Sequence, residues 1–201
     1  MDAFSDASSG FGVGITIGKS WWAWRLLPGW KADGRDIGWA EAVGFELLIL
    51  SVLSSSGGSI NFKVYGDNKS VVEGWWKGRS RNKQTNLIFH RIHALLGFKQ
   101  SSIHTRYVPS KQNPADDPSR GVYPPASLLL PKFPIPPELN SLIINFNAST
   151  PNLEQGDCQH NPPALLPKPH RLLSENEHAT LNAELDRCGE ELLSSNPQSG
   201  S

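Results

Sequence analysis

Four acidic residues stand where the sequence predicts a strand to end or a helix to begin. They are Asp6, Glu41, Asp67 and Asp116. Asp6 lies on the first expected strand and Asp67 ends the fourth, so parallel pairing of these two strands would bring the two carboxylates side by side. Carboxylates that meet at one end of a sheet repel one another unless cations lie between them.

Ligands that are all oxygen favour Mg²⁺ or Mn²⁺ and not zinc. Two such ions about 4 Å apart can drive in-line attack on a phosphodiester, because one activates water and the other stabilises the leaving oxygen. The four carboxylates thus predict a site for two Mg²⁺ or Mn²⁺ ions. Simpler interpretations exist for single residues, since Asp67 can cap a helix and Asp6 can form a turn. The joint placement of the four favours the metal site.

The elements that must position these acids follow from the hydrophobic pattern. Three extended, Gly-rich or Trp-rich runs come first, and helices then alternate with strands. Asp36 is the expected N-cap of the first helix, and the turn from 115 to 117 opens a last short helix. The order β-β-β-α-β-α-α-β predicts an α/β fold with a mixed five-stranded sheet and helices on its faces.

Charge and composition divide the chain of 201 residues, whose net charge is zero. Residues 1–121 hold 15 basic and 10 acidic side chains, whereas residues 122–201 hold 4 and 9. All seven Trp precede residue 77, and twelve of the sixteen Pro follow residue 121. We therefore expect a domain over 1–121, a Pro-rich linker over 122–170 and a tail over 171–201.

The tail contains one predicted amphipathic helix, because Ser174 and Glu177 form a capping box ahead of an apolar stripe at Leu181, Leu185, Cys188 and Leu192. We interpret it as a frayed or docked helix, and a partner-binding role is the alternative.

The compartment is predicted to be intracellular, in the cytoplasm or the nucleus. The N-terminus lacks the basic and apolar regions of a secretory signal, and two cysteines cannot build a disulfide framework. The longest apolar run, 45–53, is far shorter than the roughly 20 residues that span a bilayer. We expect neither secretion nor a transmembrane segment.

Four short motifs in order carry a family resemblance. They are Asp6-Ala7-Ser8 with Gly10 and Gly12, Trp39-Ala40-Glu41, Asp67-Asn68 with Val71-Val72, and the run from Asn113 to Gly121. Together they resemble the ribonuclease H superfamily, specifically the ribonuclease H-like domains of reverse transcriptases from fungal-type retroelements. The resemblance covers roughly residues 3–121.

The resemblance implies a ribonuclease H-like fold and metal-dependent cleavage of the RNA strand in an RNA–DNA hybrid. It implies that Asp6, Glu41, Asp67 and Asp116 are the catalytic metal ligands, and that a reverse transcriptase accompanies the domain in a parent polyprotein. Met1 lies only five residues before Asp6, which suggests a start within such a polyprotein.

Cellular members of this superfamily carry a His in the loop before the last Asp. The loop 108–113 has none, and His104 lies on the preceding strand. The alternative function is therefore a catalytically degenerate module that binds nucleic acid or protein partners.

Nucleic-acid contacts are expected mainly from the basic loop 77–83, because its cations can neutralise phosphates and Trp75 or Trp76 can stack on a base. A solvated loop with both Trp partly in the core is the alternative. The predicted contact residues are Ser8, Asn68, Lys77, Arg79, Arg81, Lys83 and Asn113.

Glu46 competes with Glu41 for the role of the helical ligand. The two residues are five positions apart on the helix and point about 140° away from each other, so they cannot share one site. Glu41 is preferred because it lies near the helix start. Gly44 would let this helix approach the sheet closely beneath the metals.

Overall fold

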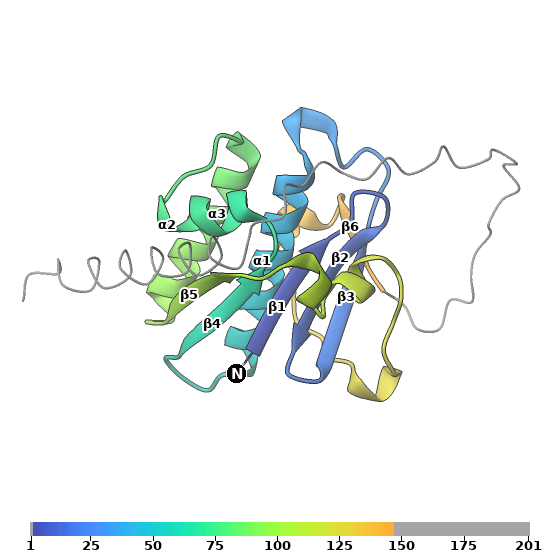
Figure 1. Ribbon diagram of the computed structural model, residues 1–201. Coiled ribbons are helices and arrows are strands. Elements are labelled where there is room, and N and C mark those ends of the chain that lie inside the picture. Colours follow the sequence, from blue (N-terminus) through green and yellow to red (C-terminus); the bar gives the residue numbers. More distant parts are fainter. Residues whose placement is uncertain (1, 147–201) are drawn as a thin grey trace, which may run out of the picture.

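The computed structural model describes residues 2–146, and the predicted tail helix and both cysteines lie outside them. A mixed sheet has the strand order β5-β4-β1-β2-β3-β6 (Figure 1). Strands β1, β2 and β3 are antiparallel neighbours, whereas β4 pairs in parallel with β1 and β5 in parallel with β4. The strands are β1 (Asp2–Ala7), β2 (Gly12–Ile17), β3 (Ser20–Leu26), β4 (Asn61–Gly66), β5 (Ser102–Tyr107) and β6 (Ile143–Asn145).

The helices are α1 (Ile37–Ser55), α2 (Lys69–Trp76), α3 (Lys83–Phe98) and α4 (Asp116–Ser119). Short 3₁₀ turns are η1 (Ala32–Gly34), η2 (Ser110–Gln112), η3 (Ala126–Leu128) and η4 (Pro137–Leu139). The expected α/β class is confirmed, and so is the mixed sheet with helices on its faces.

The sheet has six strands and not the expected five, because residues beyond 121 continue the domain. β6 pairs antiparallel with β3, where Leu26 lies opposite Ile143. Leu130, Leu139 and Ile143 are buried in the core. The domain boundary predicted at residue 121, and the linker predicted over 122–170, are therefore wrong up to β6. The physical reason is that apolar residues between the prolines cover the otherwise open edge of the Trp-rich strand β3.

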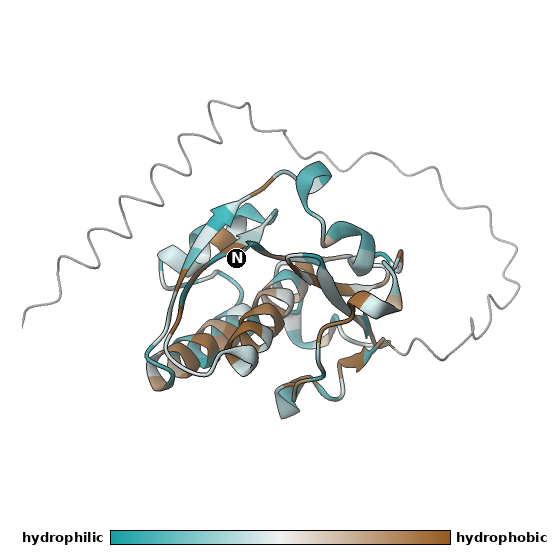
Figure 2. Cartoon of the chain, turned by 90° about the horizontal axis from the view of Figure 1, so that it is seen from below, coloured by the Kyte–Doolittle hydropathy of each residue, from teal (hydrophilic) through white to brown (hydrophobic). Residues whose placement is uncertain are grey.

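Helix α1 forms the centre of the core. Its side chains are buried along most of its length, and Asp36 caps it by accepting a 2.9 Å bond from the Trp39 amide. By length and composition alone this helix could cross a membrane, yet 78% of the apolar window is buried within the domain. Its hydrophobicity is thus explained by packing, and Figure 2 shows hydrophobic residues concentrated in the helical layer and the strands facing it.

Two glycines bring helices close to the strand that carries Asp6. A Cβ on Gly44 would lie 3.1 Å from Val13 Cγ1 and 3.5 Å from the Asp6 carbonyl, so α1 lies tightly on one face of the sheet. A Cβ on Gly14 would lie 2.6 Å from the Ser119 nitrogen, so α4 lies tightly on the other. The close approach of α1 at Gly44 is as the sequence predicted.

Candidate metal centre

Asp6, Glu41 and Asp67 meet where two parallel strands end. Ser5 of β1 lies opposite Gly66 of β4, so the next residues, Asp6 near the end of β1 and Asp67 just beyond β4, lie at the same end of this strand pair. Glu41 reaches this end from the second turn of α1. One carboxylate oxygen from each of the three residues lies within 4.8 Å of the others. Three of the four predicted ligands therefore form one group.

The electrostatics of this group favour a bound cation. Burial, followed by the charge of Asp67, raises the pKa of Asp6 to about 7, although a hydrogen bond from Ser119 opposes the shift. The Ser110 hydroxyl donates to Oδ2 of Asp67. The other carboxylate oxygen of Asp67, Oδ1, is buried and has no hydrogen-bond partner among the described residues. The carboxylate oxygens are crowded together, and one of them is buried without a hydrogen bond. Such oxygen ligands suit Mg²⁺ or Mn²⁺.

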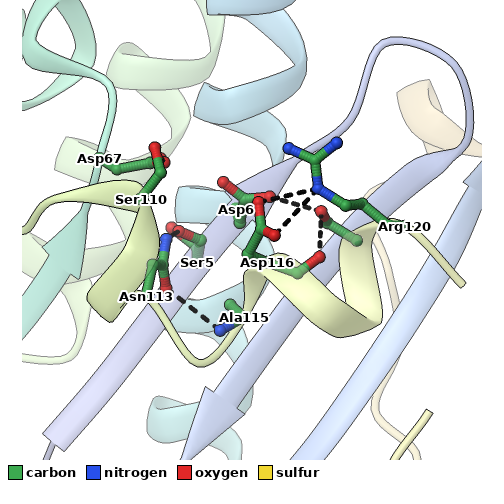
Figure 3. Close-up of polar contacts among 9 residues, drawn as sticks. Ser5, Asp6, Asp67, Ser110, Asn113, Ala115, Asp116 and Arg120 are labelled. Carbon is green, nitrogen blue, oxygen red and sulfur yellow. Dashed lines mark hydrogen bonds and ion pairs between the residues drawn. The ribbon is translucent and has the colours of Figure 1, made fainter. Parts of the chain in front are cut away.

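Asp116, the fourth predicted ligand, lies beside this group without joining it. Its two carboxylate oxygens each accept a 2.9 Å bond from Nε of Arg120, one helical turn further on. Asp116 also contributes to the raised pKa of Asp6, behind burial and Asp67. Figure 3 shows the side chains of Asp6 and Asp116 next to each other, with Arg120 above them.

The segment that carries Asp116 is fastened to β1 by Asn113. This side chain is only 5% exposed; its Nδ2 donates to the Ser5 carbonyl at 3.0 Å and its Oδ1 accepts from the Ala115 amide at 3.1 Å. Its side chain thus serves the fold, and the prediction that Asn113 contacts nucleic acid stays a prediction. Its role is to hold the last motif against the first strand.

Helix capping does not account for Asp67, because Asn68 is the N-cap of α2. Oδ1 of Asn68 accepts a 3.2 Å bond from the Val71 amide. The simpler interpretation of Asp67 is thus wrong, and its carboxylate faces the acidic group instead.

Glu46 lies in a separate ion pair, which favours Glu41 as the helical ligand. Its carboxylate accepts two 2.7 Å bonds from Arg91 of α3. Burial raises the pKa of Glu46, and the bonds and charge of Arg91 act in the opposite direction.

His104 and Trp75 both have ring partners away from the acidic group. His104 of β5 has its ring 5.5 Å from that of Trp76. Trp75 is buried in the core against Phe45 and Phe89, as the alternative interpretation of the basic loop expected.

A groove of about 910 Å³ separates the start of α1 from α2 and the basic loop. Lys77, Arg79 and Arg81 line it, whereas Lys83 and Ser8 are not among its lining residues. Asn68 and Val71 line both this groove and a cavity of about 10 Å³ next to Glu41. At Asn68 and Val71 the groove therefore adjoins a small cavity that Glu41 also lines.

Solved structures that are similar to this chain include two RNase H structures. The chain is similar to the RNase H1 structure of the archaeon Halobacterium salinarum, with 17% identity and a TM-score of 0.43, over 60% of this chain and 95% of that one. It is also similar to the N-terminal RNase H domain of Rv2228c from Mycobacterium tuberculosis, with 16% identity, a TM-score of 0.40 and coverage of 60% and 92%. No protein-family model and no curated protein matches the chain.

Proposed function

We propose that this chain is a metal-dependent endonuclease that hydrolyses the RNA strand of an RNA–DNA hybrid. The observation that carries the proposal is the group of Asp6, Glu41 and Asp67, whose carboxylates converge at the end of two parallel strands. The motif resemblance adds the substrate class and an origin in a retroelement polyprotein that also encodes a reverse transcriptase.

In this proposal Asp6, Glu41 and Asp67 hold Mg²⁺ or Mn²⁺, and Asp116 adds a fourth carboxylate from α4. When bound, the metal would activate water and stabilise the negative charge on the leaving oxygen. Ser110 and Ser119 orient the carboxylates of Asp67 and Asp6 through their hydroxyl groups. Gly14 lets α4 lie against β2, so the backbone that carries Asp116 stays at the metal end of the sheet.

The groove supplies a path for the nucleic-acid backbone. Arg79 and Arg81 are exposed at its wall and can neutralise phosphates, whereas Lys77 is partly engaged by Glu73 at 3.1 Å. A hybrid exposes 2′-hydroxyls and a regular backbone, so binding should depend on shape and charge rather than on sequence. Replacing Arg79 and Arg81 by Gln should remove about two phosphate contacts. The slope of log affinity against log salt concentration should then become shallower by about 2.

The test is cleavage of an end-labelled RNA–DNA hybrid by the full chain. We expect cleavage of the RNA strand with Mg²⁺ or Mn²⁺ and none with EDTA or with Ca²⁺, which coordinates too loosely for in-line geometry. Double-stranded RNA and double-stranded DNA serve as substrates that should remain intact. Asp117→Asn is the matched control for Asp67→Asn, because Asp117 is an exposed acid outside the acidic group.

The same assay separates the alternative function, a degenerate module that only binds. Hybrid binding without cleavage in any of these metals would favour that alternative and reject catalysis. Cleavage that persists in Asp67→Asn would reject the acidic group as the active site.

A further inference from the structure

Arg120 stands at the edge of the acidic group, and four of its five guanidinium N–H donors have no acceptor within residues 2–146. Its side chain is 53% exposed, and only Nε bonds Asp116. Within residues 2–146 the two terminal guanidinium nitrogens have no hydrogen-bond acceptor, and Figure 3 shows them pointing away from Asp116. An arginine in this position is a permanent cation with donors available to an anion.

We propose that Arg120 is a phosphate-binding residue whose positive charge is offset, and so masked, by Asp116 until a divalent cation binds. Cation binding and hybrid binding would then reinforce each other. This inference rests on the proposed function.

The masking follows because the Asp116 carboxylate cannot bind Arg120 and a metal cation equally well at the same time. This carboxylate adjoins Asp6, yet both of its oxygens accept from Arg120. A cation held by Asp6, Glu41 and Asp67 would attract the Asp116 carboxylate and withdraw it from Nε. The exchange costs little, because ion pairs between partly exposed side chains contribute little to stability.

The unmasked guanidinium would remain at the site, because α4 is held independently of the ion pair. Ser119 bonds both the Asp6 carboxylate and the Asp116 carbonyl, and α4 already lies in close contact with β2 at Gly14. A guanidinium presents five donors in a planar arrangement that suits two phosphate oxygens at once. The anion that it would receive is therefore a backbone phosphate next to the cleaved bond.

The experiment measures hybrid affinity by fluorescence anisotropy, first in EDTA. Asp116→Asn should bind about tenfold more tightly than Asp117→Asn, which removes the same charge without releasing Arg120. The double variant Asp116→Asn with Arg120→Gln should lose this gain. Arg120→Gln alone should weaken binding no more than Lys111→Gln, an exposed cation on η2.

In Ca²⁺, which permits binding without cleavage, Arg120→Gln should bind about tenfold more weakly than Lys111→Gln. Circular dichroism and melting temperature confirm that each variant is folded. Equal affinities of Asp116→Asn and Asp117→Asn in EDTA, or an Arg120→Gln effect that is the same with and without Ca²⁺, would overturn the inference.

Failure of the inference is distinguishable from failure of the proposed function. If the wild-type protein cleaves the hybrid in Mg²⁺ but cation binding and hybrid binding are not coupled, only the role of Arg120 is rejected. If the wild-type protein binds no hybrid in EDTA or in Ca²⁺, both the role of Arg120 and the proposed function are rejected.

Discussion

Helix α1 carries two buried glutamates whose surroundings differ in one decisive respect. Glu46 is 2% exposed and has the guanidinium of Arg91 at 2.7 Å from both oxygens. Glu41 is 8% exposed and lies among further carboxylates, those of Asp6 and Asp67. Glu46 is paired with Arg91, whereas Glu41 belongs to the acidic group, in which burial and the charge of Asp67 raise the pKa of Asp6.

The difference teaches how a structural acid can be separated from a functional one. A buried carboxylate that is paired with a cationic side chain is already neutralised, so it has a structural role and does not attract a further cation. A group of crowded carboxylates is costly in the absence of a cation, and a bound cation would remove this cost.

The largest effect should come from removing one carboxylate of the acidic group. Asp67→Asn should lower hybrid cleavage at least about a hundredfold, since even the loss of an outer-shell metal contact costs 10–100-fold. The fold should survive, because Asn68 and not Asp67 caps α2. Steady-state cleavage rates in Mg²⁺ measure the first effect, and circular dichroism measures the second. A variant that loses its helical signal would show that Asp67 is structural.

Replacing Glu46 and Glu41 by Gln, one at a time, should have opposite effects on stability and cleavage. Glu46→Gln leaves Arg91 without its counter-charge and should lower the free energy of unfolding by about 2 kcal/mol, because the 28% exposure of Arg91 reduces the full cost of a broken buried pair. Glu41→Gln should abolish cleavage and lower the free energy of unfolding by less than Glu46→Gln does, because it relieves repulsion from the carboxylates of Asp6 and Asp67. Urea unfolding in EDTA compares them. A larger loss of stability for Glu41→Gln would reverse the assignment.

A smaller effect should appear in the pH dependence of stability without metal. The pKa of Asp6 is about 7 in the folded protein and 3.8 in the unfolded reference, so the folded state binds the extra proton between these values. Stability should therefore fall as pH rises from about 5 to about 7, by about 1 kcal/mol per pH unit from this group. Asp6→Asn should remove that component, and melting temperatures in EDTA at several pH values measure the difference. Identical pH profiles for the two proteins would contradict the raised pKa.

Much of this arrangement could be predicted from the sequence, because it depends on local patterns. The Asp36 cap, the periodicity of α1 and the strand that ends at Asp67 are all visible along the chain, and they locate Glu41 next to Asp6. Gly44 also gave a correct indication of close packing.

The remaining features depend on contacts between distant residues. β6 was missed because the prolines that precede it look like a linker, while its pairing depends on the open edge of β3. Asn113 has the polarity of a surface residue, and its partner Ser5 is 108 positions away. The pairing of Arg120 with Asp116 depends on the short helix α4, whose position is set by the space above Gly14.

The central claim is that an external divalent cation balances Asp6, Glu41 and Asp67. Calorimetric titration of Mn²⁺ into the wild-type protein, Glu41→Gln and Glu46→Gln, without nucleic acid and at a temperature where all three are folded, tests it most directly. We predict that the wild-type protein and Glu46→Gln bind Mn²⁺ with the same affinity, and that Glu41→Gln binds at least about tenfold more weakly. Equal binding by Glu41→Gln and the wild-type protein, or loss of binding in Glu46→Gln, would contradict the claim.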